Sequence, residues 1–275
     1  MPVDADAADL EHDGFVVVRG LMDADWCVRL CTAIEQTRSD PSPHYGVLSE
    51  PGTARVDSDL FRWSDDPVIG ALTFASPLVD LAATLLAVSE VVLVEDQWFC
   101  SAPGATTPSP WHQDGPYYHL DRPFLTVWIA LDDVDASAAL RVVAGSHATG
   151  TRYAPVEFSA GDATIGASDL PPVPDVDGDP DRFDVVTTTF RAGDALALDS
   201  RLLHATGSAP IVDRPFRRIS TRWAHPDTRF LDQGTQAARF WDVLPHGLRD
   251  GDPIAGEVFP VRRPAQVGQE TVSDG

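Results

Sequence analysis

The second half of the chain consists of short apolar runs separated by glycine, proline and aspartate, and this pattern restricts the possible fold most strongly. In PFLTVWIALDDV (123–134), Leu125, Val127 and Ile129 alternate with residues that would face the other way. Side chains of a strand point alternately to its two faces, so this run predicts a strand with two distinct faces. Further strands are expected in the ranges 14–20, 90–100, 139–147, 184–190, 193–200 and 217–223.

Helical patterns are confined to the first part of the chain. Apolar residues recur at helical spacing from Trp26 to Ile34, after Asp23, a residue type that caps helix N-termini. Residues 66–88 predict two helical stretches that a proline separates, and residues 41–66 have the mixed composition of irregular structure. Helices followed by many short strands favour a β-sandwich or jelly roll with a helical layer on one side.

Length and charge exclude several classes of function. A chain of 275 residues can bury a sizeable core as a single domain. The net charge of −22 argues against nucleic acid or an anionic membrane as a partner. The sequence contains no lysine, which excludes Schiff-base, pyridoxal-phosphate and Walker-A chemistry, because each of these requires a lysine side chain.

The cellular location follows from what the sequence lacks. No apolar run has the length of a membrane span, and the acidic, polar first residues do not resemble a signal peptide. The three cysteines, Cys27, Cys31 and Cys100, form no metal-binding or redox motif and fit a reducing compartment. We therefore expect a cytoplasmic protein.

The segment SPWHQDGPYY (109–118) places two potential metal ligands, His112 and Asp114, one residue apart. On a strand these side chains would share a face, with Gln113 pointing away. An imidazole and a carboxylate on one face supply two corners of a metal octahedron. The 2-His-1-carboxylate triad of non-haem iron enzymes then needs one more histidine. Alone, the HxD pattern is a weak signal, because short motifs have many chance matches.

The remaining ligand must come from a distant strand. His204 follows the alternating segment RAGDALALDSRLLH, and we expect it at the end of that strand, beside the pair. His147 lies at a glycine-rich turn and is expected to be structural, while His119 is too near the pair in sequence. His225 and His246 lie in polar loop sequence and are expected in solvent.

Four arginines crowd the segment DRPFRRISTRW. On a strand, Arg218, Ser220 and Arg222 would share a face opposite to Arg217. A buried arginine is costly unless it meets an anion, and a guanidinium matches a carboxylate in bidentate fashion. One arginine of this segment is therefore expected to bind an anionic ligand near the metal.

Two segments fall outside these patterns. Residues 151–183 are acidic and rich in proline and glycine, and we expect a long, mobile lid over the site. Residues 265–275 have the composition of a disordered tail.

A series of ordered segments carries a family resemblance: DQW (96–98), WHQDGPYY (111–118), LTVWIALDDVD (125–135), LRVVAGSH (140–147), AGDALALDSRLLHATG (192–207), RRISTRW (217–223) and DGDPIAGEVFP (250–260). Together they resemble the phytanoyl-CoA dioxygenase (PhyH-like) family of Fe(II)/2-oxoglutarate-dependent oxygenases. The resemblance implies a mainly β fold with flanking helices, namely a double-stranded β-helix (jelly roll, cupin-like) with an N-terminal helical layer. One domain would span residues 1–264, with the helical layer at about 21–88, the jelly-roll core at about 90–225 and a C-terminal segment to 264.

The resemblance also implies roles for individual residues. His112, Asp114 and His204 match the iron ligands, and no catalytic side chain is expected beyond the metal centre. Positions that commonly line the cosubstrate pocket are matched by Gln97, Thr126 and Trp128. Tyr117 and Tyr118, which follow the first two ligands, are expected to bind the substrate.

The arginine that binds the cosubstrate is matched less directly. Phe216 stands where the family usually has this arginine, with one residue inserted after His204. We assign the role to Arg218, which is followed by Ser220 in an Arg-x-Ser arrangement. The alternatives that remain open are Arg214, Arg217 and Arg222.

The chemistry that the resemblance implies uses Fe(II), 2-oxoglutarate and O2 to oxidise a small-molecule metabolite, as in bacterial secondary metabolism and antibiotic biosynthesis. A carboxylate at position 114 favours hydroxylation over halogenation. The alternatives are an oxidative epimerase or cyclase of the same family, a cupin-like metal-dependent oxygenase or isomerase that does not use 2-oxoglutarate, and a catalytically silent binding module. No nucleic acid or membrane partner is expected, and the sequence does not reveal the oligomeric state.

Overall fold

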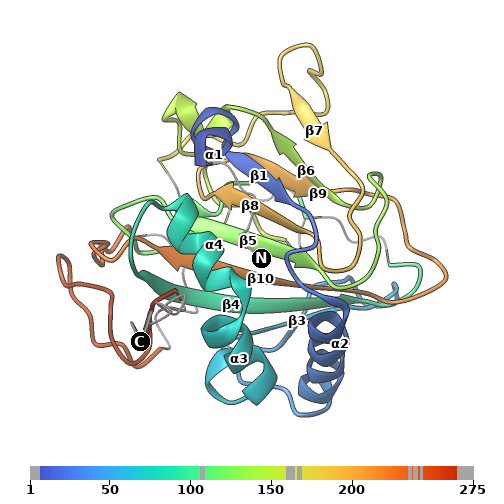
Figure 1. Ribbon diagram of the computed structural model, residues 1–275. Coiled ribbons are helices and arrows are strands. Elements are labelled where there is room, and N and C mark those ends of the chain that lie inside the picture. The colour runs from blue at the N-terminus through green and yellow to red at the C-terminus, as the bar shows by residue number, and fades with distance from the viewer. Residues whose placement is uncertain are drawn as a thin grey trace, which may run out of the picture.

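Two antiparallel β-sheets face each other in the computed structural model, and helices cover the outer side of the larger sheet (Figure 1). The structure describes residues 7–105, 109–158, 165, 169–234, 237, 241 and 244–264. The larger sheet has the order β1 (Phe15–Val18), β8 (Ala195–Asp199), β5 (Leu125–Ala130), β10 (Phe216–Ala224), β4 (Val91–Ser101), β3 (Val56–Leu60) and β2 (Gly46–Val47). The smaller sheet has the order β7 (Val185–Thr187), β6 (Leu140–Val143) and β9 (His204–Thr206).

The remaining elements lie around these sheets. A short strand, β11 (Val261–Arg262), pairs with β4 and brings the C-terminal segment back to the larger sheet. The helices are α1 (Ala7–Asp13), α2 (Ala24–Ser39), α3 (Pro67–Ala75) and α4 (Pro77–Leu85), with 3-10 turns η1 (Arg62–Ser64), η2 (Gly115–Tyr117) and η3 (Ser146–Thr149). This mainly β jelly roll with an N-terminal helical layer confirms the predicted fold class.

The alternation along β5 separates the two faces of the larger sheet, as the sequence predicts. Leu125, Val127 and Ile129 pack in the core cluster that includes α2, α3 and α4. Trp128 and Ala130 point the other way and pack against residues of β6 and β8 in a second core cluster. The helices therefore cover one face, and the space between the two sheets lies on the other.

Local sequence signals set the helix ends. The Asp23 carboxylate accepts a hydrogen bond from the backbone N–H of Trp26 at 2.8 Å and caps α2, as expected. Asp66 and Ser76 cap α3 and α4 in the same way, and each of these helices begins with a proline. Within the described residues, no single helix is long and apolar enough to cross a membrane. The pair α3 and α4 passes that test only together, bent by 45° at the break.

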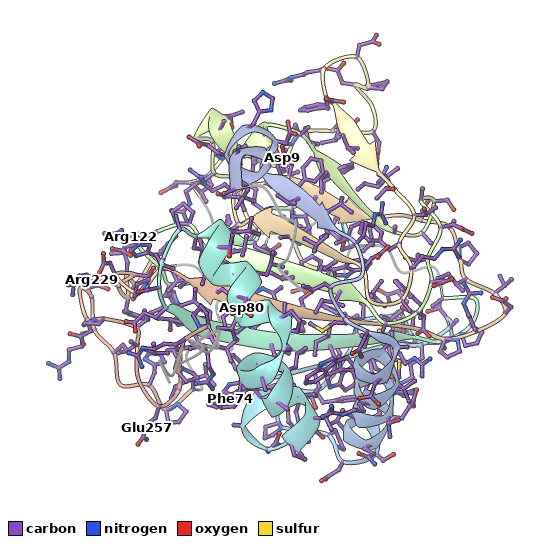
Figure 2. All side chains as sticks on the ribbon, in the orientation of Figure 1. Asp9, Phe74, Asp80, Arg122, Arg229 and Glu257 are labelled. Carbon is purple, nitrogen blue, oxygen red and sulfur yellow. The ribbon has the colours of Figure 1, made fainter. Side chains whose placement is uncertain are left out.

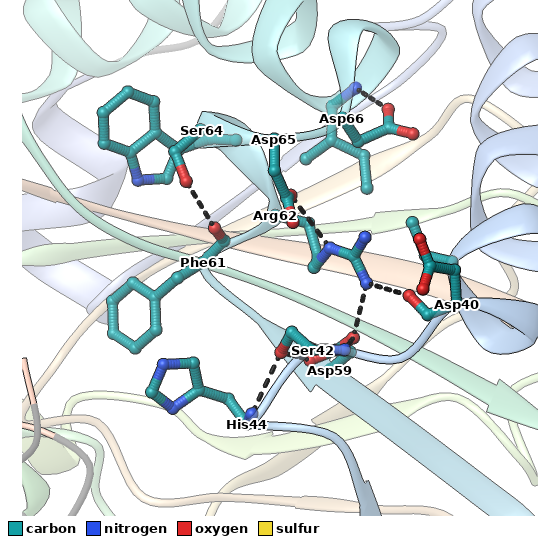
Figure 3. Close-up of polar contacts among 12 residues, drawn as sticks. Asp40, Ser42, His44, Asp59, Phe61, Arg62, Ser64, Asp65 and Asp66 are labelled. Carbon is teal, nitrogen blue, oxygen red and sulfur yellow. Dashed lines mark hydrogen bonds and ion pairs between the residues drawn. The ribbon is translucent and has the colours of Figure 1, made fainter.

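Residues 41–66 contain regular structure that the sequence pattern did not predict. Strand β3 pairs with β4, and its sequence VDSDL carries two acidic residues that are almost fully buried. Figure 3 shows the pair that accommodates one of them: the Arg62 guanidinium donates to the Asp59 carboxylate and to the Asp40 carbonyl, both at 2.9 Å. Because its buried residues include paired charges, this strand does not show the apolar alternation that predicts a strand.

The glycine that precedes β8 is required by its backbone and by its neighbours. Gly193 has a φ of +93°, and its N–H donates to the Ala130 carbonyl at 2.8 Å. A Cβ at this position would collide with the carbonyl oxygen of Met22, which precedes α2. The turn therefore fixes the entry to β8 against the start of the helical layer.

This close approach predicts different costs for two alanine substitutions. Gly20 also has a positive φ, of +60°, but nothing lies within 4 Å of the place that a Cβ would take there. Gly20→Ala should cost about 1 kcal/mol from backbone strain alone and lower the Tm by about 3 °C. Gly193→Ala adds a steric overlap of about 1–3 kcal/mol and should lower the Tm at least twice as far. Equal shifts in thermal unfolding would contradict the packing described here.

Candidate metal centre

Charged side chains such as Asp9 and Arg122 lie on the outside of the molecule (Figure 2), but four others are buried between the two sheets. These four are Glu95, Asp114, Arg218 and Arg222, each no more than 8% exposed. They line a cavity of about 410 Å³ whose other walls are largely aromatic and aliphatic. Because buried charges are costly unless they are paired or bind a ligand, this cavity is the first candidate for a functional site.

Three potential metal ligands converge on the cavity from segments far apart in the chain. The Asp114 Oδ1 atom lies 3.6 Å from His112 Nε2 and 3.7 Å from His204 Nε2. One ligand atom from each residue can be chosen so that all three lie within 4.8 Å of one another. Distances of this size allow one ion to be bound by all three side chains, so the predicted triad is brought together.

Hydrogen bonds at the far side of each imidazole set its orientation. His112 Nδ1 lies 2.8 Å from the Pro110 carbonyl, and His204 Nδ1 lies 3.0 Å from the Leu202 carbonyl. A carbonyl accepts, so each Nδ1 carries the proton and each Nε2 lone pair points toward Asp114. Burial, with His112 beside it, lowers the pKa of His204 to about 4, so this ligand is neutral at pH 7.

The outer oxygen of the carboxylate ligand is occupied by protein groups. Thr126 Oγ1 donates to Asp114 Oδ2 at 2.7 Å, and Arg222 Nε lies 3.6 Å from the same oxygen. Burial opposes ionisation of Asp114, but Arg222 and the two histidines hold its pKa well below the usual value. The carboxylate is therefore charged and presents Oδ1 toward the two imidazoles.

The local structure around the ligands differs from the expectation in two respects. His204 does not end strand 195–199, because a turn at residues 200–203 intervenes and His204 instead begins β9 of the smaller sheet. Asp114 has helical backbone angles and precedes η2, so the HxD pair is not a regular strand. His112 alone forms a bridge, with His204, while the Gln113 side chain points away as predicted.

The other histidines lie outside the triad. His147 is buried in η3, where its Nε2 lies 3.1 Å from the Glu11 carbonyl, which confirms a structural turn residue. His119 is buried and its Nδ1 accepts from the Gln233 backbone N–H at 3.2 Å. His225 and His246 are partly buried, so the expectation that both lie in solvent is wrong; His246 packs against aromatic rings of the C-terminal segment.

Strand β10 separates the four arginines by face. Arg214 precedes the strand, is exposed and pairs with the adjacent Asp213. Arg217 points to the helical side and pairs with Asp132 at 2.7 Å. The two arginines that line the cavity are Arg218 and Arg222.

Of the two cavity arginines, Arg218 lacks a carboxylate partner among the described residues. Its Nη1 donates to Ser101 Oγ at 2.7 Å, and its guanidinium lies over the rings of Phe99 and Phe216, about 5 Å from each centroid. Burial lowers the pKa of Arg218 to about 10, which still leaves the group charged at pH 7. An uncompensated buried cation of this kind requires an anion.

The predicted pocket positions lie between the metal ligands and this arginine. Gln97, Ser220 and Trp128 are Cα partners across β4, β10 and β5, and all three line the cavity. Gln97 Nε2 donates to Ser58 Oγ at 2.9 Å. Thr126 also lines the cavity, although its hydroxyl is already committed to the carboxylate ligand.

Both tyrosines after the ligands line the cavity, and each phenol is hydrogen-bonded. The Tyr117 hydroxyl accepts from the Val156 N–H and donates to its carbonyl, at 2.8 and 2.7 Å. The Tyr118 hydroxyl donates to Glu95 Oε1 at 3.0 Å. Their ring faces are therefore the parts available to a bound molecule.

The start of the predicted lid is attached to the metal-binding segment. Gln113 donates to the Thr151 carbonyl at 2.9 Å and accepts from the Tyr153 N–H at 3.0 Å. This attachment brings Phe158 to the cavity, where its ring meets His112 edge-on at 4.8 Å between centroids. Residues 159–164 and 166–168 lie outside the described residues. The sequence indicated Phe158 only as part of the expected lid, and no pattern indicated that Gln113 would hold that segment.

A jelly roll that holds two histidines and one carboxylate at a buried cavity defines the class of 2-His-1-carboxylate metal enzymes. The family comparison is more specific: the family model for phytanoyl-CoA dioxygenase (PhyH) matches residues 10–209. The chain therefore belongs to the PhyH family, as the sequence segments indicated. No curated protein matches the chain.

Solved structures share the fold at low sequence identity. The epimerase SnoN, in complex with Fe3+, alpha-ketoglutarate and nogalamycin RO, has a TM-score of 0.74 and 22% identity, covering 93% of this chain and 96% of its own. The carbocyclase SnoK from nogalamycin biosynthesis has a TM-score of 0.72 and 20% identity, covering 93% and 94%. EctD from S. alaskensis has a TM-score of 0.63 and 20% identity, covering 82% and 77%.

The contact between Thr126 and Asp114 predicts an effect on metal binding. Thr126→Val keeps the shape but leaves Asp114 Oδ2 without its closest donor, so metal affinity should fall about 10–100-fold. Thr126→Ser keeps a hydroxyl and should bind metal like the wild type. Anaerobic calorimetry with Fe(II) measures both; a valine variant that binds as tightly as the serine variant would contradict the contact.

Proposed function

We propose that the protein is an Fe(II)/2-oxoglutarate-dependent oxygenase that hydroxylates, or otherwise oxidatively tailors, a small-molecule metabolite. The main support is one observation: the His112, Asp114 and His204 triad shares a buried cavity with Arg218, a cation that lacks a carboxylate partner among the described residues. A dicarboxylic acid satisfies both ends of such a cavity. Membership of the PhyH family supports the same conclusion.

The donor set fits a ferrous ion. Two neutral imidazoles and one carboxylate are the ligands of non-haem Fe(II) oxygenases, and three protein ligands leave coordination positions for other molecules. When bound, the iron with 2-oxoglutarate and O2 supplies the oxidising chemistry. The contribution of the chain is to fix the three ligands, to exclude water with aromatic walls and to orient the two organic molecules.

The cosubstrate is expected to extend from the triad toward Arg218. Arg222, beside Asp114, and Arg218 are four residues apart on one strand, about 13 Å along its axis. The dicarboxylate and the Arg218 side chain would together cover this distance, and a guanidinium binds a carboxylate in bidentate fashion. Residues proposed to line this path are Ser220, Gln97, Thr126 and Trp128.

Charge balance supports joint binding of metal and cosubstrate. The two carboxylates and two guanidinium groups that are buried in the cavity cancel formally, while Glu157, a third carboxylate that lines it, is only partly buried. A divalent metal alone would add two positive charges to a buried site, and a dicarboxylate would remove them. The metal ion and the dicarboxylate together are therefore buried at a lower electrostatic cost than either one alone.

For the substrate, the aromatic side of the cavity favours a molecule with a substantial apolar surface. Tyr117 and Tyr118 offer ring faces, and Phe158 stacks on Tyr117 with centroids 5.6 Å apart. SnoN and SnoK, which share the fold, come from nogalamycin biosynthesis, and this supports a role in secondary metabolism.

The reaction outcome is a separate part of the proposal. A carboxylate ligand at Asp114 favours hydroxylation. An oxidative epimerase or cyclase is the second candidate, because the neighbours SnoN and SnoK are an epimerase and a carbocyclase. We further propose that residues 1–264 act as one domain. A cytoplasmic location and the absence of nucleic-acid and membrane partners stay predictions.

The function predicts conversion of 2-oxoglutarate to succinate that depends on Fe(II) and O2. His204→Ala removes one of three ligands and should reduce this turnover at least 100-fold, because the triad can no longer hold iron. His147→Ala, at a buried histidine outside the cavity, is the matched control and should retain turnover in its folded fraction. A wild-type protein that binds iron but not 2-oxoglutarate in calorimetry would instead favour the cupin-like alternative.

Assignment of the cosubstrate carboxylate to Arg218 predicts a separate effect. Arg218→Gln should raise the KM for 2-oxoglutarate by about 100-fold, since losing a buried charged partner costs about 2–5 kcal/mol. Arg217→Gln, next to it on the opposite face, should leave this KM near the wild-type value. Steady-state succinate assays compare the two; an unchanged KM in Arg218→Gln would transfer the role to another group.

A further inference from the structure

Glu95 reaches the cavity because of an irregularity in β4. Leu93 belongs to the core on the helical side, as do Trp98 and Cys100, while Gln97 lines the cavity. Strict alternation from Leu93 would place residue 95 on the helical side. The register with β10 shifts at this point, since Arg222 pairs with Glu95 while Trp223 pairs with Leu93. This bulge inserts one residue and turns Glu95 toward the metal ligands, as bulges beside active sites commonly do.

Arg222 lies between Glu95 and the carboxylate ligand. Its Nη1 donates to Glu95 Oε1 at 2.8 Å, and its Nε lies 3.6 Å from Asp114 Oδ2. Tyr118 donates to the same Glu95 oxygen and its ring lies under the guanidinium, 5.6 Å from centroid to Cζ. The contacts run in series from Tyr118 through Glu95 and Arg222 to Asp114.

Two atoms of this series lack a hydrogen-bond partner within the described part of the chain: Arg222 Nε and Glu95 Oε2, both fully buried. Stability alone does not account for such an arrangement. A buried ion pair contributes little net stability compared with apolar residues of similar size, and unsatisfied polar atoms make it worse. The Nε atom faces Asp114 Oδ2, which indicates that the guanidinium acts on the carboxylate ligand.

We infer that Arg222, held by Glu95 and Tyr118, is a positioning residue that keeps Asp114 a one-oxygen ligand of the metal. This inference rests on the proposed function. Thr126 and Arg222 occupy the side of Oδ2, which leaves Oδ1 for the metal. If both oxygens bound the metal, the triad would take four of six octahedral positions. A chelating 2-oxoglutarate would then leave none for O2, whereas a one-oxygen Asp114 leaves one.

Burial raises the pKa of Glu95 to about 7, while Arg222 and the Tyr118 hydroxyl oppose this rise, and the charged form of Glu95 has a defined part in this device. It pairs with Arg222 on the side away from Asp114 and so holds the guanidinium at a distance from the ligand oxygen. Without that charge, the guanidinium can move onto Asp114 and form a direct two-bond pair that competes with the metal for the carboxylate. Arg222 is therefore attracted in opposite directions by Glu95 and by Asp114.

Binding of Co(II), a redox-stable substitute for Fe(II), tests this directly without turnover. Glu95→Gln keeps shape and a hydrogen-bond acceptor but removes the charge, and it should weaken Co(II) binding about 10-fold. Arg222→Gln should change the ligand-field absorption spectrum of bound Co(II), because Oδ2 is released toward the metal. Calorimetry and absorption spectroscopy on the full chain measure both.

Arg217→Gln is the matched control, because it breaks an arginine–aspartate pair of similar length on the same strand but on the opposite face. It should leave Co(II) affinity and spectrum unchanged, whatever its effect on Tm. If Arg222→Gln does not fold, the Co(II) affinity of Glu95→Gln is sufficient to test the inference. Wild-type affinity and spectrum in a folded Glu95→Gln variant would overturn the inference. Failure of the proposed function is distinguishable, since the wild type would then bind Co(II) but show no 2-oxoglutarate turnover.

Discussion

The site depends on one short piece of backbone pairing. The His112 N–H donates to the His204 carbonyl at 3.0 Å, and the His204 N–H donates to the His112 carbonyl at 2.9 Å. These two hydrogen bonds join segments far apart in the chain, next to the edge of the smaller sheet. Side chains of directly paired strand residues lie on the same face, so the bridge that joins the backbones also brings the two imidazoles together.

The larger sheet supplies the other groups of the site. Its inner face supplies Thr126 and Arg222 to the outer oxygen of Asp114, and Arg218 at the opposite end of the cavity. Its outer face is packed against the helical layer, which leaves these strands little freedom to shift. Rigid strands rather than loops therefore hold both the groups around the ligand and the cation proposed to bind the cosubstrate. Because rigid strands hold them, these groups keep the exact positions that leave one coordination position of the metal open.

Charge is distributed differently inside and outside the molecule. The chain carries a net charge of −22, yet the four buried charges that line the cavity cancel formally before a ligand enters. A surplus of surface carboxylates keeps the protein soluble and imposes no fold, whereas each buried charge must be matched by geometry. This difference explains why Arg218 carries most information about function. It is a buried cation placed to bind an anion, and it lacks a carboxylate partner among the described residues.

The alternating runs predicted most of the larger sheet and both of its faces, because a half-buried strand must alternate. The pattern failed where buried groups are polar. Strand β3 was missed because its inward residues Asp57 and Asp59 are paired with arginines. Glu95 was missed because a bulge reverses the alternation in β4, and no composition signal marks a bulge. The turn before His204 was not predicted, although the polar residues Asp199, Ser200 and Arg201 interrupt the apolar alternation and the first two favour turns.

Residue types and their spacings were enough to predict the fold class, the family and the three side chains that meet at the candidate metal centre, because the motifs that carry them are short and local. Which arginine lacks a carboxylate partner among the described residues, which groups surround Asp114 and which aromatic rings face the triad were settled only by folding. Those facts depend on strand register and on contacts between distant segments. A one-residue shift in pairing would reverse them without changing a single letter of the sequence.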